Sequence, residues 1–302
     1  MPTAVLEGLK KHPVKISAVS SMLDSGGSAG RDRKLFQTKV SFGDIRRAAL
    51  ALSGLPNRQK DLFRYRFANG TSLANAYCTA SVSAMGIEAL LEDIKEDLRI
   101  AENYRVLPVT LDDALLCAEL ENGELVRGES NIDRPKHNVN LKIKKVFLYP
   151  EARAYQPAVR AIEKADLLVL GPGDLYSSLL QLLLVRGIPE AIRKSKAPKV
   201  YVCNLMTKLG ETNDFSVSDF TSEVEKYLGE KIDRVIFNKG ECFASKMASY
   251  KKEHPELLSM VRFSDTLDKD KFIGEDLLLE TGPIVHDSDK LAKTILNLCS
   301  RQ

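Results

Sequence analysis

Four polar loops carry the residue types in this sequence that could do chemistry. Each loop follows a short apolar run that predicts a β-strand, and these runs end near residues 22, 170, 203 and 237. Small residues in such loops let backbone N–H groups approach a phosphate, and neighbouring amides and carboxylates can hold a ribose, a base or a cation. The candidate ligand-binding residues are Asp24, Ser25, Gly26, Gly27, Ser28, Gly30, Arg31, Arg33, Gly171, Pro172, Gly173, Asp174, Tyr176, Ser177, Asn204, Thr207, Glu211 and Asn238.

The side chains in these loops suggest separate roles around a diphosphate. Arg31 and Arg33 can pair with its charges, whereas Asn204 and Asn238 directly follow strands and could hold a ribose or a base edge. Three carboxylates, those of Asp24, Asp44 and Asp174, could act as acids or place a divalent metal on a phosphate. Each of the three is also explained as a helix cap or turn residue, which we favour for each one taken alone.

Other catalytic arrangements have little support in the sequence. The four histidines, His12, His137, His254 and His286, are scattered outside the polar loops, so neither a Ser-His triad nor a zinc site is indicated. The loop serines lack a GxSxG context, and no Walker lysine or GxGxxG motif is present. No catalytic residue can be assigned, and the residues make no cofactor certain.

The order of the expected elements places the four loops at one edge of a sheet. Strands at 166–170, 199–203 and 233–237 alternate with helices at 176–195 and 216–228. This alternation predicts an α/β fold, a Rossmann-like, mostly parallel sheet with helices on both faces. If the strand ending near 22 lies beside the others, all four loops converge at the carboxyl edge, where such sheets bind ligands.

The first half of the chain adds helices and a β-rich insert. We expect a helix at 3–12, a helix at 41–53 capped by Ser41, and a long helical region at 72–98. The Asn122-Gly123 turn predicts a β-hairpin within an insert of about 106–149, and the polar segment 131–140 predicts an exposed loop. We treat residues 1–302 as a single domain.

Composition limits the partners. The 302 residues carry a net charge of +3, which is too balanced to indicate nucleic acid or a membrane surface as a partner. No window approaches the roughly 20 apolar residues of a membrane span. The five cysteines are well separated and form no metal-binding pattern, which indicates buried free thiols in a cytoplasmic protein.

Several long blocks, in the same order, resemble the family that joins the YvcK-like gluconeogenesis factors with CofD, the 2-phospho-L-lactate transferases. The form GPGDLYSS at 171–178, followed by LLLVRGI, is similar to the YvcK-like branch, because the transferases carry a GPSNP-type sequence there. The resemblance covers nearly the whole chain. Its other blocks are LEGLKKHP at 6–13, SGGSAGRDRK at 25–34, GDIRRAALALS at 43–53, YRF at 65–67, CAELENGELVRGESNI at 117–132 and YVCNLMTKLGETNDFSVSDF at 201–220.

The resemblance implies two functions, which the residues leave open. The YvcK-like branch implies a regulatory, non-catalytic protein that binds a UDP-sugar of the UDP-N-acetylglucosamine type and takes part in control of carbon metabolism and cell shape. The transferase branch implies an enzyme that moves a phospholactyl-type group from a guanosine diphosphate donor to a deazaflavin with magnesium. Both branches imply a homodimer. A third reading is a scaffold that has lost its ligand, and we favour the first.

One departure from the family lies at the amino end. The family opens with a strand and a GGGTG-type loop before its first helix, whereas Thr3 here stands near the position that follows that loop. We expect that a start assigned too far downstream explains the difference, and a genuinely reduced protein is the alternative. Loss of a central parallel strand would be costly, because such a strand carries two rows of hydrogen bonds.

Overall fold

A four-stranded parallel sheet forms the centre of the computed structural model, which describes residues 3–24 and 41–299. The strand order is β11-β9-β7-β6, and every neighbouring pair runs in parallel. All four residues of β7 are buried, as expected for an inner strand that is covered on both faces. The strands are β6 (Leu168–Leu170), β7 (Lys199–Val202), β9 (Arg234–Asn238) and β11 (Phe272–Glu275).

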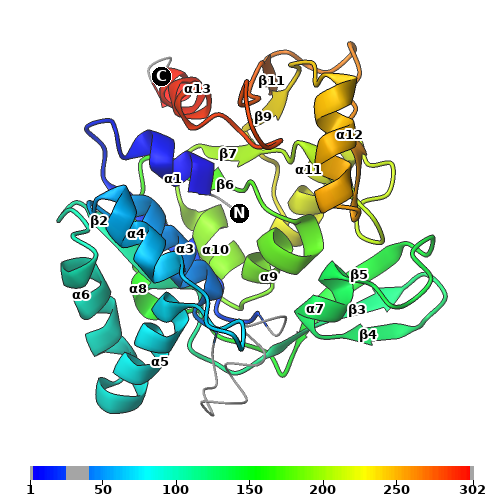
Figure 1. The fold of residues 1–302 in the computed structure, drawn as a ribbon. Helices are drawn as coiled ribbons and strands as arrows, with labels where there is room; N and C mark the ends of the chain where they lie inside the picture. Colours follow the sequence, from blue (N-terminus) through cyan, green and yellow to red (C-terminus); the bar gives the residue numbers. More distant parts are fainter. Residues whose placement is uncertain (1–2, 25–40, 300–302) are drawn as a thin grey trace.

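Helices cover both faces of this sheet (Figure 1). Val200 and Val202 face one side, where they pack with α1 (Thr3–Leu9) and α13 (Ser288–Cys299). Tyr201 faces the other side and joins the cluster that contains α9 (Leu180–Leu183), α10 (Ile188–Lys194) and α11 (Val217–Leu228). This two-residue alternation is the strand period, and it confirms the predicted α/β class.

The strand that ends near residue 22 belongs to a second, two-stranded sheet. In the described part of the chain, β1 (Ile16–Ser20) pairs in parallel with β2 (Tyr104–Pro108) and with no strand of the central sheet. The predicted side-by-side order of the strands therefore holds for β6, β7 and β9 but not for β1. Around β1 and β2 lies a separate apolar cluster containing α3 (Gly43–Leu52), α5 (Leu73–Met85) and α6 (Ile87–Asp97).

Two helix predictions need correction. Ser41 does not cap α3: the cap position is Phe42, and the Ser41 hydroxyl accepts a long hydrogen bond of 3.4 Å from the Gly43 N–H. The helical region at 72–98 consists of two helices, α5 and α6. They meet at Gly86, whose φ of +88° does not continue a helix.

The insert forms a small antiparallel sheet in the order β4-β3-β5. Its strands are β3 (Leu115–Leu120), β4 (Leu125–Arg127) and β5 (Ile143–Tyr149), and the predicted Asn122-Gly123 turn joins the first two. The prediction of an exposed loop at 131–140 is wrong at its start. Helix α7 (Glu129–Asp133) enters this segment, and the side chain of Ile132 is buried. Residues 106–108, which we placed at the start of the insert, belong instead to β2, which pairs with β1.

The remaining elements pack around these layers. None of the described helices is both long and apolar enough to cross a bilayer. Strand β8 (Met206–Lys208) pairs antiparallel with β10 (Leu257–Met260) directly beyond the carboxyl end of β7. The other elements are α4 (Asn57–Arg64), α8 (Gln156–Glu163), the π-helical turn η1 (Leu175–Leu179) and α12 (Ala244–Glu253).

Candidate functional site

The loop after β6 is held close to the end of β7. Gly171 has a φ of +78°, and a Cβ atom placed there would lie 2.8 Å from the carbonyl oxygen of Val202. Only glycine combines this backbone conformation with so close an approach. The sequence GPGD therefore brings Asp174 and the start of η1 to the carboxyl edge of the central sheet.

The N–H groups at the start of η1 already have an acceptor. Glu211 accepts hydrogen bonds from the backbone N–H groups of Tyr176 and Ser177, both at 3.3 Å, and from the Ser177 hydroxyl at 3.0 Å. Tyr176 and Ser177 are buried. These two candidates thus position Glu211, and a phosphate would have to displace that carboxylate to reach their backbone.

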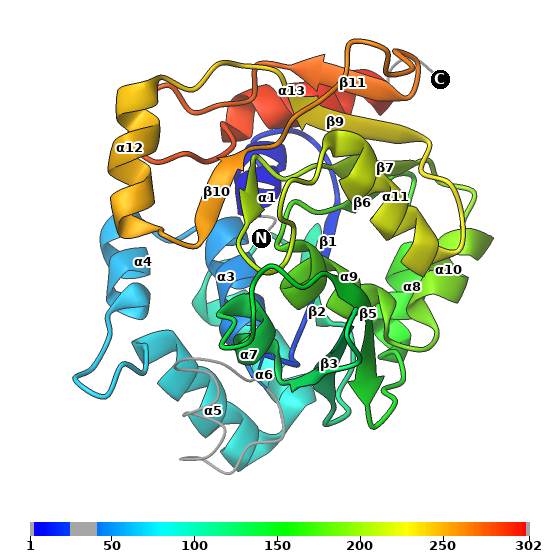
Figure 2. The same cartoon turned by 90° about the vertical axis from the view of Figure 1, so that its right-hand side faces the viewer.

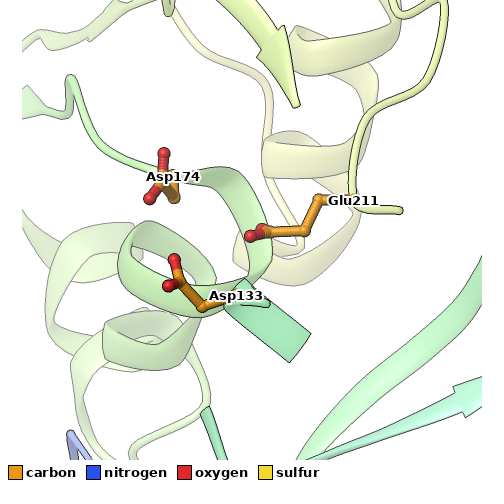
Figure 3. A group of neighbouring side chains, drawn as sticks. All are labelled: Asp133, Asp174 and Glu211. Carbon is orange, nitrogen blue, oxygen red and sulfur yellow. The ribbon is translucent and has the colours of Figure 1, made fainter. Parts of the chain in front are cut away.

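Lys208 forms ion pairs with three carboxylates from three separate segments of the chain. Its ammonium group pairs with Asp133 of α7, with Asp174 at 2.9 Å and with Glu211 at 3.0 Å. Figure 3 shows the three carboxylates turned toward one another. One oxygen atom from each carboxylate lies within 4.8 Å of the corresponding atoms of the other two, a spacing that could hold a cation. We call these four residues the Lys208 cluster.

Negative charge exceeds positive charge in this cluster. Burial alone would lower the pKa of Lys208, but attraction to Glu211, Asp174 and Asp133 outweighs burial and raises the pKa. Burial raises the pKa of the Glu211 carboxyl, while the pKa of Asp174 is lowered because Lys208 outweighs burial there. One ammonium group therefore offsets only part of the negative charge of these three carboxyl groups, of which only Glu211 is fully buried.

A second carboxyl pair adjoins the cluster. Burial and the neighbouring Asp24 raise the pKa of Glu129, at the start of α7, to about 10. Glu129 is therefore protonated at neutral pH and shares a hydrogen bond with Asp24. The Asp24 carboxylate also lies at the start of α3, where its Oδ2 is 3.3 Å from the position of a Cβ on Gly43.

The two asparagines that follow strands differ in their hydrogen bonding. Asn238 donates to the Gly240 carbonyl at 2.9 Å and accepts from the N–H groups of Gly240 and Leu277. Its side chain is thus engaged in holding its own loop. By contrast, the Asn204 carbonyl oxygen is buried and has no hydrogen-bond partner among the described residues. Asn204 therefore offers an acceptor at the end of β7.

The predicted metal candidates are only partly brought together. Asp174 is in the Lys208 cluster, Asp24 pairs with Glu129, and Asp44 forms an ion pair with Arg47 one turn along α3. Thr207, another candidate, hydrogen-bonds to Ser259 of β10 and is buried. The candidates Ser25, Gly26, Gly27, Ser28, Gly30, Arg31 and Arg33 lie outside the described residues.

The sequence prediction missed Asp133 and Lys208. Asp133 lies in the segment that we expected to be an exposed loop. Lys208 lies between the predicted candidates Thr207 and Glu211, in a stretch that we expected to be a loop and that forms β8. No local pattern marks either residue, because the contact between α7 and the segment after β7 joins positions 75 residues apart. The role of Lys208 becomes clear only in the folded structure, where its three carboxylate partners lie around it.

Comparison with known proteins identifies the family. A family model described as 2-phospho-L-lactate transferase CofD matches residues 3–271 of the chain. The chain belongs to the CofD family. Its relatives include the gluconeogenesis factor of Halalkalibacterium halodurans, which is 34% identical over 302 residues that make up 97% of this chain and 92% of that protein. The predicted resemblance to the CofD and gluconeogenesis-factor family is thereby confirmed.

Two further comparisons define the extent of the CofD family likeness. A relative from Clostridium acetobutylicum is 36% identical over 300 residues, which are 97% of this chain but 66% of that protein. The crystal structure of a UPF0052-family protein from Bacillus halodurans superposes with a TM-score of 0.87 and 33% identity, covering 97% of this chain and 96% of that one. The fold is therefore shared over nearly the whole described chain.

Proposed function

We propose that this CofD-family chain binds a nucleoside diphosphate sugar of the UDP-N-acetylglucosamine type and acts as a regulator, like a gluconeogenesis factor, rather than as an enzyme. The observation that carries the proposal is the buried Asn204 carbonyl oxygen at the end of β7, which has no hydrogen-bond partner within residues 3–24 and 41–299. A buried acceptor without a donor costs free energy, on the order of 1–3 kcal/mol. A ribose hydroxyl or a base N–H that donates to Asn204 would recover this free energy.

The position of Asn204 supports a nucleotide rather than an unrelated small molecule. It stands at the carboxyl edge of a parallel sheet, next to the close-packed loop at Gly171. Ligands of open α/β sheets bind at this edge. The relatives' name, gluconeogenesis factor, favours a regulatory role in carbon metabolism.

The negative charge of the Lys208 cluster implies that a bound diphosphate needs a divalent cation. A diphosphate placed near Asp133 and Asp174 meets carboxylates that Lys208 only partly neutralises. A divalent cation would reduce that repulsion, and its oxygen ligands could come from Asp133, Asp174 and Glu211 if the Lys208 ammonium moved aside. We therefore expect magnesium to strengthen nucleotide binding.

Calorimetric titration tests the proposal. UDP-N-acetylglucosamine should release heat on binding, more strongly with magnesium than without, and Asn204→Ala should weaken binding by about tenfold for one lost hydrogen bond. Asn122→Ala, at the exposed hairpin turn, serves as the matched control and should bind normally. Equal affinity of the Asn204→Ala variant and the unchanged protein would remove Asn204 from the site, and no heat at millimolar ligand would reject the proposal.

The alternative is a phospholactyl-type transferase, and the match to the CofD model over residues 3–271 favours it. The carboxylates of Asp133, Asp174 and Glu211 would then hold magnesium against the diphosphate of a guanosine donor. Incubation with that donor, a deazaflavin and magnesium should give a new phosphodiester, detected by mass spectrometry. If no product forms while UDP-N-acetylglucosamine still binds, the regulatory proposal is the one that stands.

A third possibility is a scaffold without a nucleotide, and a homodimer is expected in every case. Thermal melts that do not move with any nucleotide, with and without magnesium, would favour the scaffold. Light scattering on the same sample would measure the mass and so test the dimer. These two measurements are independent of the titration, so a failed titration does not hide a dimer.

A further inference from the structure

Helix α3 begins beside a cavity of about 920 Å³ that separates β1 from β6. All residues of these two strands line the cavity. Asp44, in the first turn of α3, lines it together with the loop from Gly171 to Gly173. Both views place α3 next to α1, which lines the same cavity (Figure 1, Figure 2). The start of α3 therefore lies near the carboxyl edge of the central sheet, where the Lys208 cluster is found.

Arg46 of α3 is a half-buried cation without a carboxylate partner in the part of the chain that the structure describes. Its Nη1 donates to the Ser72 hydroxyl oxygen at 3.1 Å, and its buried Nε has no hydrogen-bond partner there. By contrast, the adjacent Arg47 forms an ion pair with Asp44. A guanidinium group is not deprotonated in proteins, so Arg46 brings a charge into the fold that no ion pair offsets.

The groups around Arg46 add to its positive charge. Burial lowers the pKa of Arg46, and repulsion from Arg47 and Arg66 lowers it further. A backbone bridge to Ser72 holds Arg66 beside the residue that Arg46 contacts. Burial raises the pKa of the nearby Cys78 thiol to about 12, so this thiol is neutral at pH 7. We call Arg46, Arg47 and Arg66, which come from two segments of the chain, the arginine cluster.

An oxyanion is the ligand that fits these observations. Guanidinium groups bind phosphate and carboxylate oxygens through their N–H donors, and the Arg46 Nε–H is such a donor with no acceptor within residues 3–24 and 41–299. A phosphate group carries about 1.5 to 2 negative charges at neutral pH, so it offsets more of this positive charge than a carboxylate does. We propose that the arginine cluster binds a phosphate group, with Arg46 as its main ligand.

The phosphate can come from two sources that share this chemistry. One is the diphosphate of the nucleotide proposed above, because the arginine cluster lies within electrostatic range of the Lys208 cluster. Burial would raise the pKa of Asp174, but attraction to Lys208 and also to Arg47 lowers it. The other source is a free phosphate or a phosphorylated small molecule that binds beside the nucleotide. Either source places the anion on the arginines and away from the carboxylates.

Titration with inorganic phosphate tests the site without any nucleotide. Sodium phosphate is added to the full chain at constant ionic strength, with sodium chloride as the matched salt, and binding is followed by calorimetry. Arg46→Met should bind phosphate about tenfold more weakly or worse, because a charge-assisted hydrogen bond is lost. Arg46→Lys should keep part of the affinity, because it keeps the charge. Arg64→Met is the matched control and should bind normally, since Arg64 of α4 pairs with Asp61 on the surface.

Thermal melts distinguish a phosphate ligand from a structural residue. If Arg46 only holds Ser72 at the start of α5, Arg46→Met should lower the melting temperature equally in phosphate and in chloride. If Arg46 binds the anion, phosphate should raise the melting temperature of the unchanged protein and of Arg64→Met but not that of Arg46→Met. Equal phosphate affinity of Arg46→Met and the unchanged protein would overturn the proposal, as would no binding to the unchanged protein at millimolar phosphate.

Competition with UDP identifies the source of the phosphate. Weaker binding of inorganic phosphate in the presence of UDP would support the nucleotide diphosphate as the occupant of the arginine cluster. Binding of both together would support a second, phosphorylated ligand. If UDP-N-acetylglucosamine fails to bind while inorganic phosphate still binds through Arg46, the function proposed above is rejected and the phosphate site stands.

Discussion

The two edges of the central sheet carry ionic clusters with opposite charge balance. At the carboxyl edge, one lysine meets three carboxylates in the Lys208 cluster. At the amino edge, one carboxylate, that of Glu225, accepts from Lys271 at 2.5 Å, from Lys231 at 2.8 Å and from the Ile232 N–H at 2.9 Å. We call Glu225 with Lys231 and Lys271 the Glu225 cluster.

The two clusters also differ in the direction in which the pKa of their buried glutamate is shifted. Burial would raise the pKa of Glu225, but its lysine partners outweigh burial and lower the pKa. In the Lys208 cluster, the Glu211 pKa is raised despite the nearby lysine. An excess of carboxylates around one lysine does not stabilise a fold, so its position at the edge where α/β proteins bind ligands supports the site proposed above.

The largest effect is expected when the one cation of the Lys208 cluster is removed. Lys208→Met leaves the buried Glu211 carboxylate and the half-buried Asp133 and Asp174 carboxylates without their cation, and it should lower the free energy of unfolding by about 3–5 kcal/mol at neutral pH. Urea unfolding measures the loss, which should shrink at about pH 5 and below as the carboxyls protonate. A loss below about 1 kcal/mol would mean that the carboxylates do not depend on Lys208, and the contrast between the edges would fail.

The next effect concerns the loop that holds Asp174 in place. Gly171→Ala combines a φ of +78° with a contact of 2.8 Å to the Val202 carbonyl, and we expect a loss of about 2–4 kcal/mol. Gly123→Ala is the matched control: its φ is +87°, but an added Cβ meets nothing within 4 Å, so only about 1–2 kcal/mol should be lost. Equal losses of unfolding free energy in the two variants would show that the contact of the added Cβ with the Val202 carbonyl does not destabilise the protein.

The pH dependence of stability should have opposite signs at the two edges. The pKa of Glu129 in the folded protein is about 10, above its ordinary value of 4.5, so its contribution is complete below 4.5 and is lost as pH rises toward 10. The lowered pKa of Glu225 makes its contribution complete above its ordinary pKa and lost as pH falls.

Urea unfolding of Glu129→Gln and Glu225→Gln across pH 5 to 9 measures this difference. Glu129→Gln should remove part of the fall in stability on the alkaline side. Glu225→Gln should leave the alkaline side unchanged, because Glu225 is ionised there in both the folded and unfolded states. If both variants keep the alkaline slope of the unchanged protein, Glu129 is not protonated in the fold.

The smallest effect is expected from a lysine of the Glu225 cluster. The Lys231 side chain is 85% exposed, so Lys231→Met should change the free energy of unfolding by less than about 1 kcal/mol. Comparison with Lys208→Met uses the same substitution at the opposite edge, where the Lys208 side chain is only 7% exposed. A loss at Lys231 as large as that at Lys208 would contradict the contrast in burial.

Local patterns in the sequence were sufficient to predict most helices and strands of the second half of the chain. The β6, β7 and β9 strands and the α11 helix follow apolar periodicity, and the Ser216 cap of α11 is formed with Asp219 as expected for a capping box. The candidate site was harder to predict from the sequence. Asp174, Glu211 and Asn204 were predicted from their positions after strands, but their contacts differ. Asp174 and Glu211 pair with Lys208, whereas the Asn204 carbonyl oxygen has no hydrogen-bond partner in the part of the chain that the structure describes.

The sequence by itself determined the α/β alternation, the hairpin turn, the polar strand-end loops and the family, because each depends on residues that are close together in the chain or on ordered blocks. Only the tertiary structure decided that β1 stands apart from β6 across a cavity, and that Asp133 joins Lys208 from 75 residues away. The physical reason is that strand neighbours and buried ion pairs are selected by packing between distant segments, for which local periodicity carries no information.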